Sequence, residues 1–186
     1  MSAASVAPTA PADGRVLETD RLILRLLVTD DAPFILQLVN DPDWLRYIGD
    51  KGVRNLDDAR AYIANGPVAM YGRVGFGLYC VELKGTARPI GMCGLIKRDT
   101  FDDVDIGFAF LPAFRACGYA AEAAQATLAH GFATIGLRRI IAITSPDNAA
   151  SGRLLEKVGL RFERMLAIPG EDREVRQYAC AAPAGG

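Results

Sequence analysis

One stretch of the chain joins a strand-like run to a helix-forming run through a loop that suits an anion. It runs from Asp105 to Glu122, and its loop reads Arg-Ala-Cys-Gly-Tyr-Ala over residues 115–120. The first turn of a helix exposes unpaired backbone N–H groups at the positive end of the helix dipole. Small side chains let a phosphate reach them, and Arg115 can add a charge-assisted hydrogen bond. The stretch therefore predicts a diphosphate site, and the competing interpretation is an ordinary strand-to-helix turn.

Two well-known phosphate loops do not fit this stretch. No Gly-Lys-Ser/Thr sequence follows Gly118, as a Walker loop would require. The spaced glycines of the dinucleotide-binding fingerprint are also missing. A phosphate ligand would therefore be held here in another way.

The apolar pattern predicts the elements that position this loop. Aliphatic and β-branched runs predict strands over residues 21–27, 76–83, 90–97, 104–111, 139–144, 160–165 and 175–180. Helical spacing, capping residues and terminal glycines predict helices over 29–40, 55–66, 116–135 and 148–158, with a loop or short helix over 42–47. The chain is therefore expected to be α/β, with a mixed six- or seven-stranded sheet and helices on both faces.

Length and composition bound the class of protein. The chain has 186 residues, which suits one domain, expected over residues 15–180. Residues 1–14, rich in Ala, Pro and Ser, predict a disordered tail, and residues 181–186 a flexible end. With 21 basic and 22 acidic residues, the net charge of −1 argues against broad nucleic-acid binding. No apolar run is long enough to span a membrane, so no membrane partner is expected.

Cysteine usage argues against a metal site. The four cysteines form no C-x-x-C pair, and one histidine, His130, is present to join them. Scattered single cysteines without a signal peptide predict reduced thiols and a cytoplasmic protein. His130 falls within the alanine-rich helix, where we interpret it as structural. No metal is therefore expected.

The loop resembles the signature of the GCN5-related N-acetyltransferases (GNAT), R/Q-x-x-G-x-G/A, with Arg115, Gly118 and Ala120 in its three defined places. The Leu-Pro-x-Phe-Arg lead-in is similar to the RimJ/RimL-type branch. Residues 148–160 resemble a second stretch of the family, N-x-x-S…E-K-x-G-F, and residues 19–25 are typical of the RimJ/RimL-type branch. The resemblance covers roughly residues 17–178. It implies a mostly antiparallel sheet in which two neighbouring parallel strands, 105–111 and 139–144, splay apart.

The resemblance also implies an acetyl-CoA site. The pantetheine arm would lie between the splayed strands, against backbone groups of residues 108–111. Two N–H donors there would stabilise a developing oxyanion. The implied cosubstrate-binding residues are Phe108, Phe110, Leu111, Arg115, Ala116, Cys117, Gly118, Tyr119, Ala120, Asn148 and Ser151. For Asn148 a helix N-cap is the competing role, and both roles are compatible.

The catalytic residues are less well defined. Many relatives carry a tyrosine as general acid where this chain has Leu155, and leucine donates no proton. Ser151, a water or no acid at all then remains. Asp105 is the candidate base for the attacking amine, directly or through water, and a solvated or paired aspartate is the competing interpretation. Asp103 and Glu82 are weaker candidates.

Cys117 and three aromatic side chains are further candidates for a role in the site. A covalent route through Cys117 is disfavoured, because its loop faces phosphates and no base is evident. Trp44, Tyr47 and Tyr71 lie in segments that wall the acceptor side in relatives, where they recognise substrate or simply pack.

The resemblance predicts an N-acetyltransferase that moves an acetyl group from acetyl-CoA directly to a primary amine. The acceptor is expected to be a protein N-terminus or a small-molecule amine, and the enzyme a monomer or homodimer. A non-catalytic acyl-CoA-binding or sensing module remains an alternative. A protein that binds another nucleotide diphosphate is a more distant one.

Overall fold

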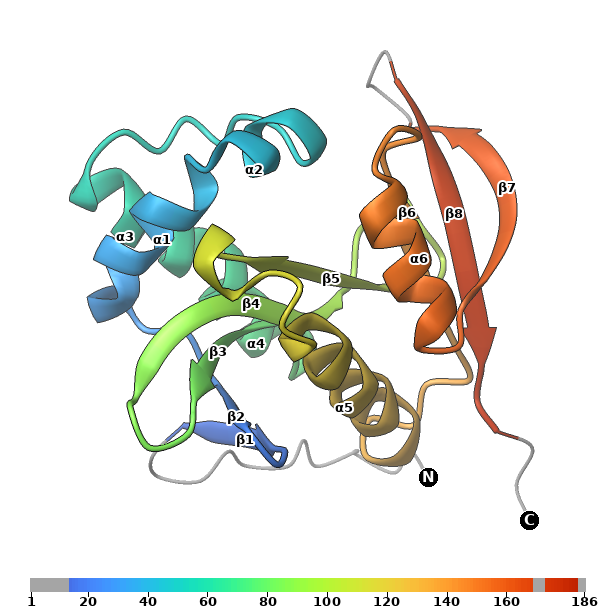
Figure 1. Ribbon diagram of the computed structural model, residues 1–186, viewed down its shortest axis with the longest axis horizontal. Helices are drawn as coiled ribbons and strands as arrows, with labels where there is room; N and C mark the ends of the chain where they lie inside the picture. Colours follow the sequence, from blue (N-terminus) through green and yellow to red (C-terminus); the bar gives the residue numbers. More distant parts are fainter. Residues whose placement is uncertain (1–13, 169–172, 184–186) are drawn as a thin grey trace.

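The computed structural model describes residues 14–168 and 173–183. It contains a single eight-stranded sheet with helices on both faces (Figure 1). Its strands are β1 (Arg15–Glu18), β2 (Leu22–Arg25), β3 (Leu78–Leu83), β4 (Arg88–Ile96), β5 (Val104–Phe110), β6 (Arg139–Thr144), β7 (Arg161–Ala167) and β8 (Glu174–Ala181). Its helices are α1 (Ala32–Val39), α2 (Pro42–Tyr47), α3 (Leu56–Ile63), α4 (Ala69–Val74), α5 (Tyr119–Ala133) and α6 (Ala149–Lys157). The expected tail lies outside the described residues except for Gly14, as do residues 184–186 at the expected flexible end.

The strand order is β1-β2-β3-β4-β5-β6-β8-β7, and every described neighbour pair is antiparallel except β5 and β6. The expected mixed, mostly antiparallel sheet is therefore confirmed, but the expected count of six or seven strands is wrong. The extra strand, β1, has only four residues and is partly exposed. So short a run carries little periodic signal, and its pairing with β2 defines it.

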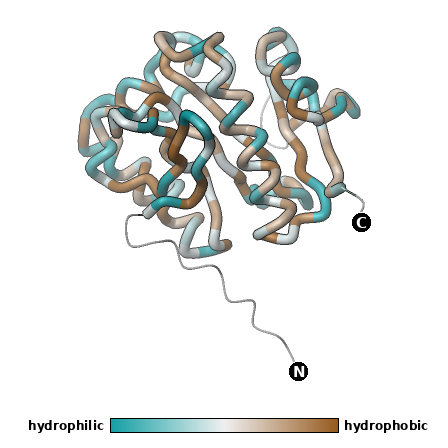
Figure 2. Tube along the Cα trace, turned by 60° about the horizontal axis from the view of Figure 1, so that its bottom comes forward, coloured by the Kyte–Doolittle hydropathy of each residue, from teal (hydrophilic) through white to brown (hydrophobic). Residues whose placement is uncertain are grey.

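The two faces of the sheet carry separate apolar cores. One core joins β3–β6 to helices α5 and α6 and includes Leu95, Ile106 and Leu128. The other joins the sheet to α1, α2 and α3 and includes Leu38 and Met92. Figure 2 shows apolar residues along the inner segments, with hydrophilic residues gathered at outer turns. Side chains along β4 and β5 alternate between the two faces of the sheet, so each strand contributes residues to both cores.

The helix expected to end at Asn65-Gly66 does not end there. A π-helical turn, Ala64–Val68, carries the chain from α3 into α4 and contains Pro67. Gly66 does not take the left-handed conformation typical of a helix end, and Gly75 (φ 82°) closes α4 instead. Burial of Pro67 favours continuation over termination. In the described part of the chain, no helix combines the length and hydropathy needed to cross a membrane.

Candidate active site

The two parallel strands at the centre of the sheet separate soon after they meet. Their pairing consists of Val104 with Ile140 and Asp105 with Ile141. Beyond this point β5 continues to Phe110 and β6 to Thr144 without further pairing. The strands therefore open a gap in which backbone groups of β5 have no neighbouring strand.

The gap exposes backbone groups of alternate β5 residues. The N–H of Leu111 donates to the carbonyl of Ile90 at 2.9 Å, on the side of β4. Backbone groups alternate along an antiparallel strand, so those of Phe108 and Phe110 face the gap. One of these groups, the Phe110 carbonyl, accepts from Arg115 Nε at 2.9 Å. The N–H of Leu111, expected to face a ligand, is already used within the sheet.

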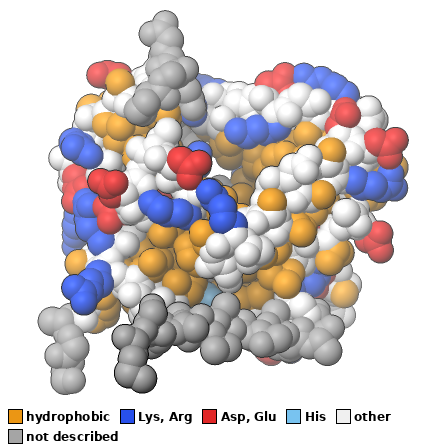
Figure 3. Space-filling model, turned by 180° about the vertical axis from the view of Figure 1, so that it is seen from behind, with side chains coloured by type: hydrophobic (Ala, Val, Ile, Leu, Met, Phe, Trp, Pro, Cys, Tyr) orange, Lys and Arg blue, Asp and Glu red, His pale blue; other side chains and the backbone are white. Residues whose placement is uncertain are grey.

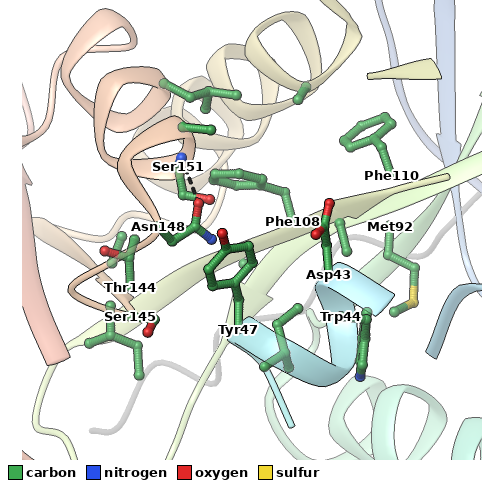
Figure 4. Close-up of a pocket in the computed structure, with 18 of the residues that line it drawn as sticks. Asp43, Trp44, Tyr47, Met92, Phe108, Phe110, Thr144, Ser145, Asn148 and Ser151 are labelled. Atoms are coloured by element: carbon green, nitrogen blue, oxygen red, sulfur yellow. Dashed lines mark hydrogen bonds between the residues drawn. The ribbon is translucent and has the colours of Figure 1, made fainter. Parts of the chain in front are cut away.

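A cleft of about 1080 Å³ follows this gap. One wall is made by β6 and α6, the opposite wall by α2, and the floor by β5 and β4. Figure 4 shows Tyr47 rising from α2 toward Asn148 at the start of α6, with Phe108 beside them. The cleft therefore brings together residues that lie about 100 positions apart in sequence.

The loop before α5 lies at one end of this cleft. Ala116 and Gly118 both take left-handed backbone conformations, with φ of 58° and 82°, and Gly118 is the N-cap of α5. The first backbone bond of the helix runs from Glu122 N to Gly118 O, so the N–H groups preceding Glu122 in the first turn are not used within the helix. Ala116 and Ala120 line the cleft. Cys117, Gly118 and Tyr119 belong to the loop but do not line it.

Glu122 fixes the start of α5 against the β1–β2 turn. Its carboxylate accepts from Thr19 Oγ1 at 2.6 Å and from Arg21 Nε at 2.7 Å. Arg21 also donates to the carbonyl of Cys117 at 3.1 Å and lies 4.5 Å from the ring centre of Tyr119. The block at residues 19–25 thus has a local role, which is to hold the helix whose N-terminus faces the cleft.

Arg115 lines the cleft but binds other parts of the protein. Its guanidinium pairs with Asp43 at 2.6 Å and with Asp41, both at the start of α2. The side chain therefore joins the loop to α2, and its charge is largely compensated by two carboxylates. Contact of Arg115 with a diphosphate stays a prediction.

The start of α6 supplies polar groups to the opposite wall. Asn148 is its N-cap, with Oδ1 accepting from Ser151 N at 3.1 Å, and both side chains border the cleft. Capping uses the amide oxygen and leaves the amide nitrogen for another partner. Leu155, one turn further on, is 1% exposed and packs in the core beneath α6.

Asp105 lies buried where β5 and β6 separate, with 2% of its surface exposed. Its carboxylate accepts from Arg98 Nε at 3.1 Å. Burial raises the pKa of Asp105, and the nearby Arg98 charge and hydrogen bond partly oppose that rise. A carboxylate with a raised pKa is a better proton acceptor than an exposed one.

Sequence reasoning missed Arg98. The register of the β4–β5 hairpin pairs Ile96 with Asp105, which brings Arg98 beside the aspartate. The weaker base candidates are placed elsewhere. Glu82 pairs with Arg25, and Asp103 with Arg139.

The remaining singled-out side chains divide between the cleft and the core. Trp44 and Tyr47 line the cleft. Tyr71 does not: its hydroxyl bonds to Leu78 O and accepts from Leu27 N at 3.1 Å, and its ring stacks on Tyr79. His130 is partly buried in α5, away from the cleft. Within residues 14–168 and 173–183, no three potential ligands gather to hold a metal.

Comparison with known proteins agrees with this geometry. The family model described as "Acetyltransferase (GNAT) domain" matches residues 21–161. The chain is 32% identical over 152 residues to the uncharacterized N-acetyltransferase YoaA of Bacillus subtilis, covering 81% of this chain and 85% of that protein. The chain therefore belongs to the GNAT family and is a GNAT-family N-acetyltransferase.

Solved structures share the fold. A GNAT-family acetyltransferase from Bacillus anthracis superposes with a TM-score of 0.74 at 30% identity, covering 88% of this chain and 96% of that one. RimL, a ribosomal L7/L12 alpha-N-protein acetyltransferase, superposes with a TM-score of 0.76 at 18% identity, covering 90% and 93%. A second RimL structure was solved with coenzyme A. At 18% and 17% identity, the two RimL structures show that the fold is shared and nothing further.

Proposed function

We propose that this enzyme transfers the acetyl group of acetyl-CoA directly to a primary amine, with Asp105 as the base. One observation carries the proposal. A single cleft joins the free N–H groups of the α5 N-terminus to the open edge of β5 and to a buried aspartate. Diphosphate, thioester and amine thus each have a chemically suited position in one continuous site.

The residues present fit acetyl-CoA. The first turn of α5 suits the diphosphate, and Asn148 can bond the pantetheine arm through its free amide N–H. Bound acetyl-CoA supplies a thioester, so that a C–N bond to the amine forms while the C–S bond breaks and CoA leaves as the thiol. The N–H groups of Phe108 and Phe110 are suited to donate to the carbonyl oxygen as its charge develops.

Two protons must be handled in this transfer. The amine must lose a proton to attack, and Asp105 accepts it, directly or through a water. A thiolate is a tolerable leaving group, and Ser151, beside Asn148, is the candidate to protonate it. Holding both reactants in one cleft supplies much of the rate.

Release of free thiol from acetyl-CoA across a panel of primary amines, with mass analysis of the products, tests the transfer. We expect thiol release to depend on the amine and to match the amount of acetylated product. Tight binding of CoA without transfer to any amine would favour a non-catalytic acyl-CoA-binding module. Binding of ATP in preference to CoA would overturn the assignment of acetyl-CoA as the cosubstrate.

Asn148 offers a matched test of the cosubstrate site. Asn148→Ala and Asn55→Ala each remove an asparagine N-cap, from α6 and α3 respectively. Each is expected to lower the free energy of unfolding by about 1 kcal/mol. Only Asn148→Ala is expected to weaken acetyl-CoA binding as well, by roughly five- to tenfold, because one hydrogen bond is worth about 1 kcal/mol. Calorimetric titration measures the acetyl-CoA affinity. Equal affinities in the two variants would show that Asn148 acts only as a helix cap.

A further inference from the structure

We infer that the acceptor is a small primary amine with an apolar body, bound in a pocket between α2, α3 and the Asp105 face of β5. This inference rests on the proposed acetyl transfer and names its substrate class. The acceptor pocket is the part of the cleft lined by Leu38, Trp44, Tyr62, Leu78, Met92 and Ile96. Figure 3 shows a hollow in this rear view, with charged side chains at its rim and hydrophobic ones around it.

The alternation along β5 separates the acceptor pocket from the α5 side. Ile106 and Phe110 belong to the core beneath α5, whereas Ala109 packs with the core of α1–α3. Asp105 and Gly107 share the face of Ala109. A Cβ atom added to Gly107 would lie 3.1 Å from Ile96 Cδ1 and 3.5 Å from Leu78 Cδ2. Ile96 and Leu78 therefore pack closely over Gly107, on the same face of β5 as Asp105.

The chemistry of the lining selects an apolar body with one cationic end. These six side chains are aliphatic, aromatic or thioether, whereas Asp105, the buried acid next to them, is paired with Arg98, which also lines the cleft. The ammonium group of the acceptor would share this carboxylate with Arg98, and the carboxylate then takes its proton. A second cationic group on the acceptor would lie against the apolar side chains or near the Arg98 charge, and both positions are unfavourable.

The available space favours a small molecule over a protein N-terminus. The whole cleft measures about 1080 Å³ and must also hold the acetyl-pantetheine arm, so the remainder suits a compact ligand. Arg46 of α2 pairs with Asp147, ahead of α6, at 2.8 Å. This exposed ion pair joins the two walls of the cleft at the surface.

Trp44 gives a means to detect a ligand in the acceptor pocket, because it lines the cleft. Trp44 is also the single tryptophan of the chain, so intrinsic tryptophan emission reports on the acceptor pocket alone.

Titration of the CoA-bound enzyme with primary amines, followed by Trp44 emission, tests the inference without turnover. The probes are n-butylamine, n-hexylamine, phenylethylamine, 1,4-diaminobutane and a tripeptide with a free N-terminus. We expect the dissociation constant to fall by about fourfold per added methylene until the acceptor pocket is full. The diamine and the tripeptide are expected to bind at least tenfold more weakly than n-hexylamine. Tighter binding of either would overturn the inference.

A matched pair of variants places the binding in the acceptor pocket. Ile96→Lys adds a cation at a partly buried lining position, and Phe162→Lys adds one at a half-exposed position on β7, outside the cleft. Ile96→Lys is expected to weaken n-hexylamine binding at least tenfold, by repulsion and loss of apolar contact, while Phe162→Lys leaves it unchanged. Equal affinities would overturn the inference, provided that thermal melting shows both variants folded.

Thiol release measured on the same amines separates this inference from the proposed function. Amine binding that changes Trp44 emission without thiol release would support the acceptor pocket but overturn the proposed acetyl transfer. Thiol release with the tripeptide or the diamine in preference to n-hexylamine would support acetyl transfer but overturn the inference that the acceptor has an apolar body.

Discussion

Replacing Asp105 by asparagine is expected to lower kcat by at least about 100-fold, which is the usual contribution of a positioned base. Asparagine keeps the shape of the side chain but cannot accept the proton of the attacking amine. The variant should fold, because it removes a charge whose burial is unfavourable. Arg98, its partner, is 42% exposed and stays hydrated. Steady-state thiol release and thermal melting measure the two effects.

The pH dependence gives a more specific test of Asp105. In the wild-type enzyme kcat should rise with pH as Asp105 loses its proton, because only the carboxylate can act as base. Burial raises the pKa of Asp105, so this rise should lie above the range of an exposed aspartate. In Asp105→Asn that limb should disappear. A pH profile that keeps the limb in the variant would assign the base to another group.

Arg98 provides a second direction for the same test. The Arg98 charge lowers the pKa of Asp105, against the larger effect of burial. Arg98→Met should therefore raise that pKa further and move the limb to higher pH, with activity retained on the alkaline side. A limb that stays in place would show that the titrating group is not Asp105.

Replacing Ala120 by glutamate is expected to weaken CoA binding by at least about tenfold, because the new carboxylate would lie beside the diphosphate at the start of α5. Like charges placed together in an interface cost several kcal/mol. The helix itself should not suffer, since an acidic side chain in the first turn interacts favourably with the helix dipole, by roughly 0.3–1 kcal/mol. Calorimetric titration with CoA measures the loss of affinity.

Ala133→Glu is the matched control for this change. Ala133 is exposed in the last turn of the same helix, where a negative charge is unfavourable to the dipole. It should therefore lower stability slightly and leave CoA binding unchanged, the reverse of the effects at Ala120. Ala120→Gln separates charge from size. If Ala120→Glu bound CoA normally, the diphosphate would not lie at this helix.

The sequence alone determined the family, the order of the elements and the loop that opens α5. These features are local: a glycine in a left-handed turn, an alanine-rich helix and an alternating strand can each be recognised from a short run of neighbouring residues. The same locality explains the errors. β1 is a strand only through its pairing with β2, and burial of Pro67 carries the helix past Asn65-Gly66.

The tertiary structure alone decided how the site is assembled. The register of β4 and β5 brings Arg98 to Asp105, and the packing of α2 turns Arg115 toward Asp41 and Asp43. The β5–β6 pairing ends after Asp105 and so opens the gap, and the aspartate lies buried at the base of that gap. Each of these contacts depends on a distance in space that only folding sets. The burial that raises the pKa of Asp105 exists only once both cores have closed around the sheet.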